Sequence, residues 1–128
     1  MREVKLLLAP TAYTFATDTV ELNFNVPKWA VGALFNLNVA SMSGTAETVD
    51  LKLQHIGPHA AAAKDVLGAS ITQLAAAANI LLTIDPRITV VANVAIAHAL
   101  SSQMRALLSL GGSTDEAYNI ALSVEFYS

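Results

Sequence analysis

The strongest constraint on the fold of this chain is a period-two alternation of apolar and polar residues. The alternation is clearest near the C-terminus, where residues 104–110 and 120–126 have an apolar side chain at every even-numbered position. Successive side chains of a β-strand point to opposite faces, so each segment has one face suited to burial and one suited to water. This pattern is typical of antiparallel sheets and not of doubly wound parallel ones.

The same alternation recurs upstream, in segments 22–26, 35–39 and 49–53. Turn-forming residues separate the alternating segments, among them Pro27, Gly57-Pro58 and Asp85-Pro86-Arg87. Strand-like segments therefore recur at intervals of about 12 to 20 residues. The sequence predicts one all-β domain over residues 1–128, an antiparallel β-sandwich of jelly-roll or Ig-like type with about seven or eight strands.

The two C-terminal segments allow a finer prediction. We expect 104–110 and 120–126 to pair as a hairpin across the loop that begins at Gly111-Gly112, with their even-numbered apolar residues on one face. In that register Arg105 and Glu125 would share the wetter face of the hairpin.

Four other regions are less clearly patterned. The alanine-rich segment 59–67 favours one short helix, because alanine has the highest helix propensity. Segment 74–79 reads as a turn or a loop. Segment 90–97 is apolar without clean alternation, and we expect it to be a strand or an extended segment at a subunit contact. Residues 1–10 are either the first strand of the sandwich or an N-terminal arm.

The composition points to an assembly. Charged residues make up 13% of the chain and hydrophobic residues 54%, whereas an ordinary soluble domain has about 25% charged residues. A free monomer needs a charged surface, so we expect this chain to hide part of its surface in a homo-oligomer. The net charge is −3 and no basic run is present, which argues against nucleic acid as a partner.

No apolar run approaches the ~20 residues that a helix needs to cross a bilayer, so we expect no membrane partner. The N-terminal stretch 1–9 has too short an apolar core for a signal peptide and carries Glu3. We therefore expect synthesis in the cytoplasm. The absence of cysteine excludes disulfides, zinc–thiolate sites and thiol catalysis.

Candidate chemistry is sparse. His55 and His59 are four residues apart, but Gly57-Pro58 would break a helix between them, and we expect His55, His59 and His98 to be exposed loop residues rather than metal ligands. No Gly-x-Ser-x-Gly motif or phosphate-binding glycine loop is present. The sequence therefore predicts no catalytic, cofactor-binding or metal-binding residues, and a protein that is not an enzyme.

Aromatic residues are also few. Trp29, the single tryptophan, follows Pro27-Lys28, and we interpret it as an anchor in the core or at an interface. A carbohydrate-binding sandwich usually presents several aromatic side chains on one platform, so this composition weighs against sugar binding.

Several segments together resemble small virion proteins of tailed bacteriophages. They are residues 49–55 (VDLKLQH), 71–74 (ITQL), 82–85 (LTID), 104–106 (MRA) and 110–112 (LGG), and the likeness spans roughly residues 31–126. The resemblance implies a β-sandwich on the phage head, most simply a capsid decoration or cement protein. Such a protein would bind the major capsid protein, form a homo-oligomer with a trimer favoured, and stabilise the shell.

That resemblance also implies a location on the capsid surface of the virion, after synthesis in the host cytoplasm. Two alternatives stay open. One is another virion component, such as a head–tail connector, a tail protein or a head-fibre protein. The other is a carbohydrate-binding β-sandwich module.

Overall fold

The computed structural model describes residues 1–14, 18–44, 48–56, 63–91, 94–111 and 117–128, and over these residues the chain forms nine β-strands and no helix. The strands are β1 (Arg2–Thr14), β2 (Asp18–Asn25), β3 (Gly32–Ser43), β4 (Thr48–His55), β5 (Lys64–Leu74), β6 (Ala78–Ile84), β7 (Ala95–Ile96), β8 (Gln103–Gly111) and β9 (Ala117–Tyr127). Eight are long, and β7 has only two residues. The predicted all-β class is confirmed.

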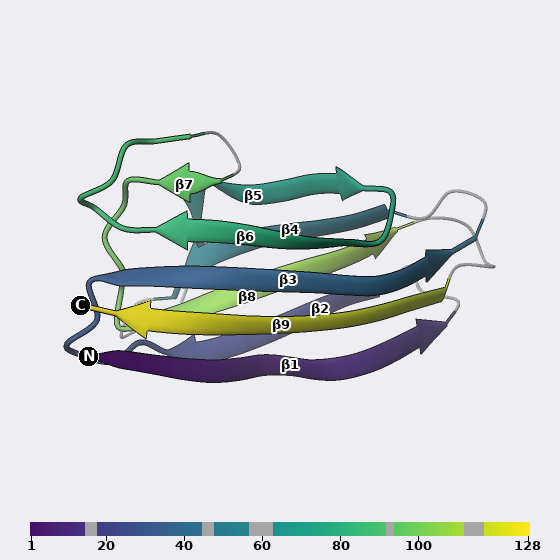
Figure 1. Ribbon diagram of the computed structural model, residues 1–128, viewed down its shortest axis with the longest axis horizontal. Coiled ribbons are helices and arrows are strands. Elements are labelled where there is room, and N and C mark those ends of the chain that lie inside the picture. The colour runs from purple at the N-terminus through teal and green to yellow at the C-terminus, as the bar shows by residue number, and fades with distance from the viewer. Residues whose placement is uncertain (15–17, 45–47, 57–62, 92–93, 112–116) are drawn as a thin grey trace.

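Two sheets pack face to face (Figure 1). Sheet A has five strands in the order β1-β9-β3-β6-β7, and sheet B has four in the order β2-β8-β4-β5. All pairs are antiparallel except β6 with β7, which run parallel. The predicted antiparallel sandwich is therefore correct.

The strand pairs are nested. The first long strand pairs with the last (β1 with β9), the second with the second-last (β2 with β8), β3 with β6, and β4 with β5. This order arises when one long hairpin, with its tip between β4 and β5, winds around a common core. The winding is that of a jelly roll, which decides between the jelly-roll and Ig-like alternatives.

The predicted C-terminal hairpin is wrong. β8 pairs with β2 and β4 in sheet B, whereas β9 pairs with β1 and β3 in sheet A. The even-numbered apolar residues of both strands are buried, as predicted, but they face each other across the core. Alternation fixes which side of a strand is buried, and this requirement is met equally by paired strands and by strands in opposed sheets.

The predicted placement of Arg105 and Glu125 on one face of a hairpin is wrong for the same reason. Arg105 donates from Nε to Oδ1 of Asn23, 2.9 Å away, on the outside of sheet B. Glu125 accepts from Arg2, 2.5 Å away, on the outside of sheet A.

The short helix predicted over 59–67 is also wrong where the structure describes it. Residues 64–67 belong to β5, and residues 57–62 lie outside the described part of the chain. In β5, Lys64 and Asp65 pair with the end of β4, and Val66 is 2% exposed in the core. Strand pairing and burial outweigh the helix propensity of the neighbouring alanines.

The predicted turn near residues 74–79 lies between β5 and β6, which end at Leu74 and begin at Ala78. Residues 2–10 belong to the first strand and do not form a separate arm, because β1 pairs with β9 along the edge of sheet A. Pro10 lies within a register shift of this pairing, between Leu8 and Thr11. A proline that lacks an N–H is tolerated on an edge strand of this kind.

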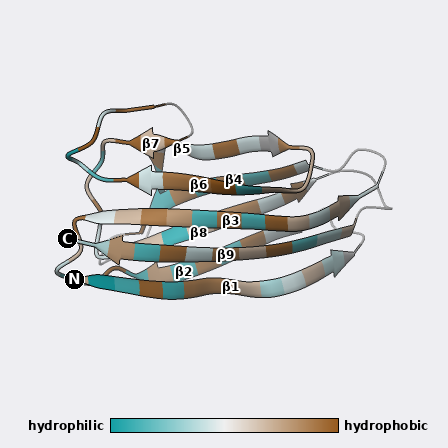
Figure 2. Cartoon of the chain, viewed as in Figure 1, coloured by the Kyte–Doolittle hydropathy of each residue, from teal (hydrophilic) through white to brown (hydrophobic). Residues whose placement is uncertain are grey.

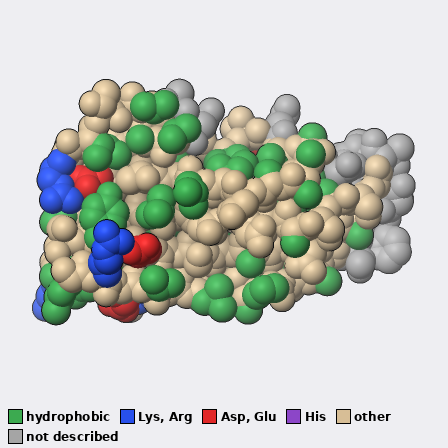
Figure 3. Space-filling view, in the orientation of Figure 1, with side chains coloured by type: hydrophobic (Ala, Val, Ile, Leu, Met, Phe, Trp, Pro, Cys, Tyr) green, Lys and Arg blue, Asp and Glu red, His purple; other side chains and the backbone are tan. Residues whose placement is uncertain are grey.

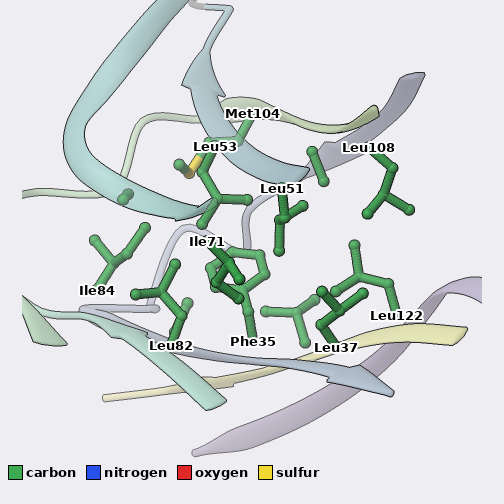
Figure 4. Packing of buried hydrophobic residues seen from close by; sticks show 14 of the residues in the cluster. Phe35, Leu37, Leu51, Leu53, Ile71, Leu82, Ile84, Met104, Leu108 and Leu122 are labelled. Carbon is green, nitrogen blue, oxygen red and sulfur yellow. The ribbon is translucent and has the colours of Figure 1, made fainter. Parts of the chain in front are cut away.

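The core lies between the sheets and is filled by aliphatic and aromatic side chains from both (Figure 4). Phe35, Leu37 and Leu122 of sheet A meet Leu51 and Leu108 of sheet B, and each of these five side chains is at most 1% exposed. Along β3 and β9 the hydropathy colouring alternates from residue to residue (Figure 2). The period-two pattern of the sequence is therefore the pattern of burial.

The alternation predicts very different costs for two adjacent leucines of β8. Leu108→Ala should lower the free energy of unfolding by about 2–5 kcal/mol, because it removes a fully buried side chain. Leu107→Ala, on the half-buried outer side, should cost about 1 kcal/mol or less. Denaturant unfolding measures both, and equal losses would contradict the assigned faces.

Candidate interaction face

The outer surface of sheet A is defined by the side of each strand that points away from the core. Strand pairing places the odd-numbered residues of β9 beside the even-numbered residues of β3 and of the first half of β1. We call this surface the neutral face. It consists of Arg2, Val4, Leu6, Leu34, Asn36, Asn38, Asn79, Leu81, Thr83, Ala121, Ser123 and Glu125.

The neutral face carries one acid and one base, and they neutralise each other. Arg2 and Glu125 form an ion pair of 2.5 Å beside a shallow depression of about 240 Å³, whose lining also includes Leu34 and Thr83. On the other side of β1, the ammonium group of Lys5 donates to the backbone oxygen of Asn25 in β2. Figure 3 shows this face, with its charged side chains gathered at one end and none across the rest of the described surface.

Exposed hydrophobic side chains lie on the neutral face and beside the strands of sheet A. Seven large ones are exposed among the described residues: Val4, Leu6 and Leu81 on the neutral face, Met1 just before β1, and Val90, Val91 and Val94 in the segment between β6 and β7. Val4 is 70% exposed and Leu81 is 50% exposed. A set of apolar side chains on one side of a protein typically marks a contact surface.

The described residues of segment 90–97 lie at the β7 edge of sheet A. Val91 forms an isolated bridge with Ala95, and β7 adds to sheet A beside β6. Its predicted place at a subunit contact stays a prediction.

The outer surface of sheet B differs in chemistry. It carries five charged side chains: Glu21, Asp50, Lys52, Asp65 and Arg105. Arg105 lies 4.0 Å from Glu21, and Lys52 lies 3.4 Å from Asp65. The two faces of the sandwich are therefore unequal, one charged and one neutral with exposed aliphatic groups.

A groove of about 430 Å³ crosses sheet B between β8, β4 and β5. Gln54 donates from Nε2 to Asp65 over 2.8 Å at its side, and this hydrogen bond is the main reason that the pKa of Asp65 is lowered. Among the described residues that line the groove, none is aromatic.

A buried carboxylate anchors the end of sheet A nearest the chain termini. Asp85 is 2% exposed and accepts hydrogen bonds from the backbone and guanidinium of Arg87 and from the hydroxyl of Tyr127. The Arg87 contacts lower the pKa of Asp85 to about 2, against its burial. Gly32 makes room for the Tyr127 ring, because a Cβ there would collide with it.

The sequence indicates only a turn at residues 85–87. The Asp-Pro-Arg run predicts a turn after β6, and the structure places its carboxylate against the last strand of the chain. A pattern in one segment carries no information about a partner 42 positions away.

The three histidines were predicted to be exposed loop residues. His98 is exposed, but His55 ends β4, is half-buried and lies with its ring centroid 4.8 Å from that of His98. The Nδ1 atom of His55 is 2.8 Å from the hydroxyl of Ser101. Burial, and secondarily the proximity of His98, lower the pKa of His55. His59 lies outside the described residues.

In the described ranges, no group of three or more histidine, cysteine or acidic side chains is placed to hold a metal ion. Over the same ranges, no helix has the length and apolar character to traverse a bilayer. Trp29 is partly buried and packs against the core, which agrees with its interpretation as an anchor.

Comparisons with known proteins identify the fold and not a family. No protein-family model and no curated protein sequence matches the chain. Among solved structures, VP2 of the infectious bursal disease virus subviral particle superposes with a TM-score of 0.60 at 10% identity, over 98% of this chain and 32% of VP2. The chain thus spans about a third of VP2 and shares a β-sandwich with this viral protein.

Two other structures match less well. Latent PorU from Porphyromonas gingivalis has a TM-score of 0.45 at 14% identity, over 98% of this chain and 12% of PorU. A xylan-binding domain of family CBM 22 has a TM-score of 0.32 at 14% identity, over 94% of this chain and 81% of that domain. Both are too distant to carry an argument about this chain.

The Asp85 anchor predicts a pH-dependent contribution to stability. The folded pKa is about 2 and the ordinary value is 3.8, so the charged form stabilises the fold by about 2 kcal/mol above pH 4. This contribution should disappear as the pH falls from about 4 to 2. Asp85→Asn should therefore be destabilised at pH 7, with a difference from the unmodified protein that shrinks below pH 4 in denaturant unfolding. Glu21→Gln, at an exposed position, is the control and should show neither effect.

The histidine pair predicts a measurable shift in titration. His98→Asn should raise the pKa of His55 part of the way to its ordinary 6.5, because the charge effect of His98 is lost while the effect of burial stays. NMR of the imidazole protons measures this pKa. Because the folded pKa is lowered, the stabilising effect of neutral His55 is full above pH 6.5 and declines at lower pH. A pKa of His55 that does not move in the variant would refute the coupling.

Proposed function

We propose that this chain is a structural protein of a virion, a decoration protein that binds the major capsid protein of a tailed phage and stabilises its head. The observation that carries the proposal is the one-sided surface. All of the large exposed hydrophobic side chains that the structure describes lie on or beside sheet A, whose outer face holds a single, self-neutralised ion pair. Such a surface is suited to permanent cover in an assembly.

The fold supports the same proposal. Jelly rolls are a common architecture of viral capsid proteins, and the VP2 structure that this chain resembles is that of a subviral particle. The segments that resemble small virion proteins of tailed phages make the virion, and its capsid surface, the best-supported location. They also carry the choice of a phage, which the fold alone does not indicate.

The mechanism is mechanical. A rigid sandwich that contacts two neighbouring capsid subunits adds buried area across their boundary, and a standard interface buries roughly 1,600 Å². The shell can then open only if these contacts break as well. The buried core and the Asp85 anchor keep the sandwich stiff. The sandwich therefore does not deform when the two capsid subunits are pulled apart.

The proposal is tested by mixing the purified chain with shells of the phage that encodes it, prepared without the protein. We expect saturable co-sedimentation, with a copy number that matches the capsid lattice and a higher temperature of shell disruption. Shells that already carry the protein are the control and should bind no more. A copy number that matches the single portal vertex would indicate a neck protein, and no binding would refute the proposal.

A further inference from the structure

We propose that the neutral face of sheet A packs against the same face of a second copy of this chain, about a two-fold axis. The inference deepens the proposed function, since it names the partner of that face, and it rests on the proposed function for the premise that the face is covered.

Charge selects the partner. The neutral face offers no unpaired charge, because Arg2 and Glu125 are bound to each other. A charged surface placed against it would lose its hydration without gaining an opposite charge, and burial of uncompensated charge costs several kcal/mol. The outer face of sheet B carries three acids and two bases, against the single ion pair of the neutral face, so its burial would remove more charge from water and it is the poorer partner. The neutral face of another copy meets the requirement.

The polar groups of the face suit self-association as well. Asn38 and Asn79 lie side by side in the pairing of β3 with β6, and both are exposed. A side-chain amide donates and accepts, so two copies of one asparagine-bearing surface can satisfy each other without a second kind of surface.

The area is sufficient. The four strands that bear the neutral face (β1, β9, β3 and β6), at a spacing of about 4.8 Å, give a width of about 19 Å, and strands of about nine residues give a length near 30 Å. The resulting face is on the order of 600 Å², at the lower end of the ~600–1,000 Å² that each partner contributes to a stable interface. Val4 and Leu6 lie along one edge of this area, and Leu81 lies near the other.

Symmetry then sets the number of copies. A surface that contacts itself is isologous and closes after two subunits. A trimer, favoured by the resemblance to phage virion proteins, needs two different patches that complement each other on every subunit. The neutral face is one patch that matches itself, so the contact formed through it is a dimer.

The test is the solution mass of the purified chain, by light scattering after gel filtration and by sedimentation over a range of concentrations. We expect twice the mass of the 128-residue chain. Leu81→Lys, which places a charge on the neutral face, should weaken the dimer at least tenfold. Thr72→Lys adds the same charge to an exposed position of β5 in sheet B and should leave the dimer unchanged.

Circular dichroism establishes that each variant is folded. Val4→Lys, at a position 70% exposed, replaces Leu81→Lys if that variant does not fold. A monomer at all concentrations, a trimer, or a dimer that resists the lysine on the neutral face would each overturn the inference. A dimer that does not bind shells would uphold it and refute the proposed function, whereas a monomer that binds shells would do the reverse.

Discussion

The packing of two apolar sheet faces against each other is the interaction on which the rest of this structure depends. The nested pairing of strands brings β9, at the end of the chain, between β1 and β3, and it brings β8 between β2 and β4. Each sheet thus has a central strand from the C-terminal part of the chain, and the buried sides of these two strands meet in the core. Because both sheets require these strands, neither sheet is complete until the chain has closed on itself.

Once the inner faces are committed to the core, only the outer faces and the ends of the sandwich are available for contacts. The outer residue at each position is then free to vary in chemistry without cost to the core. The outer positions of the two sheets differ in this chain. Those of sheet B include charged residues such as Glu21 and Lys52. Those of sheet A include aliphatic and amide residues such as Leu81 and Asn38. The difference between the faces is therefore a property of the outer positions alone.

Much of the fold could be predicted from the sequence, since the buried side of β8 and of β9 follows directly from their alternation. The partner of each strand could not be predicted, because opposed and paired strands demand the same pattern. The strand 64–74 was missed at its start, where pairing with His55 and the burial of Val66 override an alanine-rich context. The neutral face was beyond prediction as well, because Val4 and Leu81 become members of one surface only when β1 and β6 join the same sheet.

The placement of charge also bears on how an apolar surface avoids indiscriminate association. Aliphatic groups attract any apolar surface, so the selectivity of a neutral face comes from what surrounds it. Here the ion pair of Arg2 with Glu125 and the buried Asp85 with Arg87 lie at the end of sheet A that holds the termini. A partner that slides toward this end must remove water from Arg2 or Arg87, which are more than half exposed. The charged end therefore opposes displaced arrangements and favours those that leave the arginines in water.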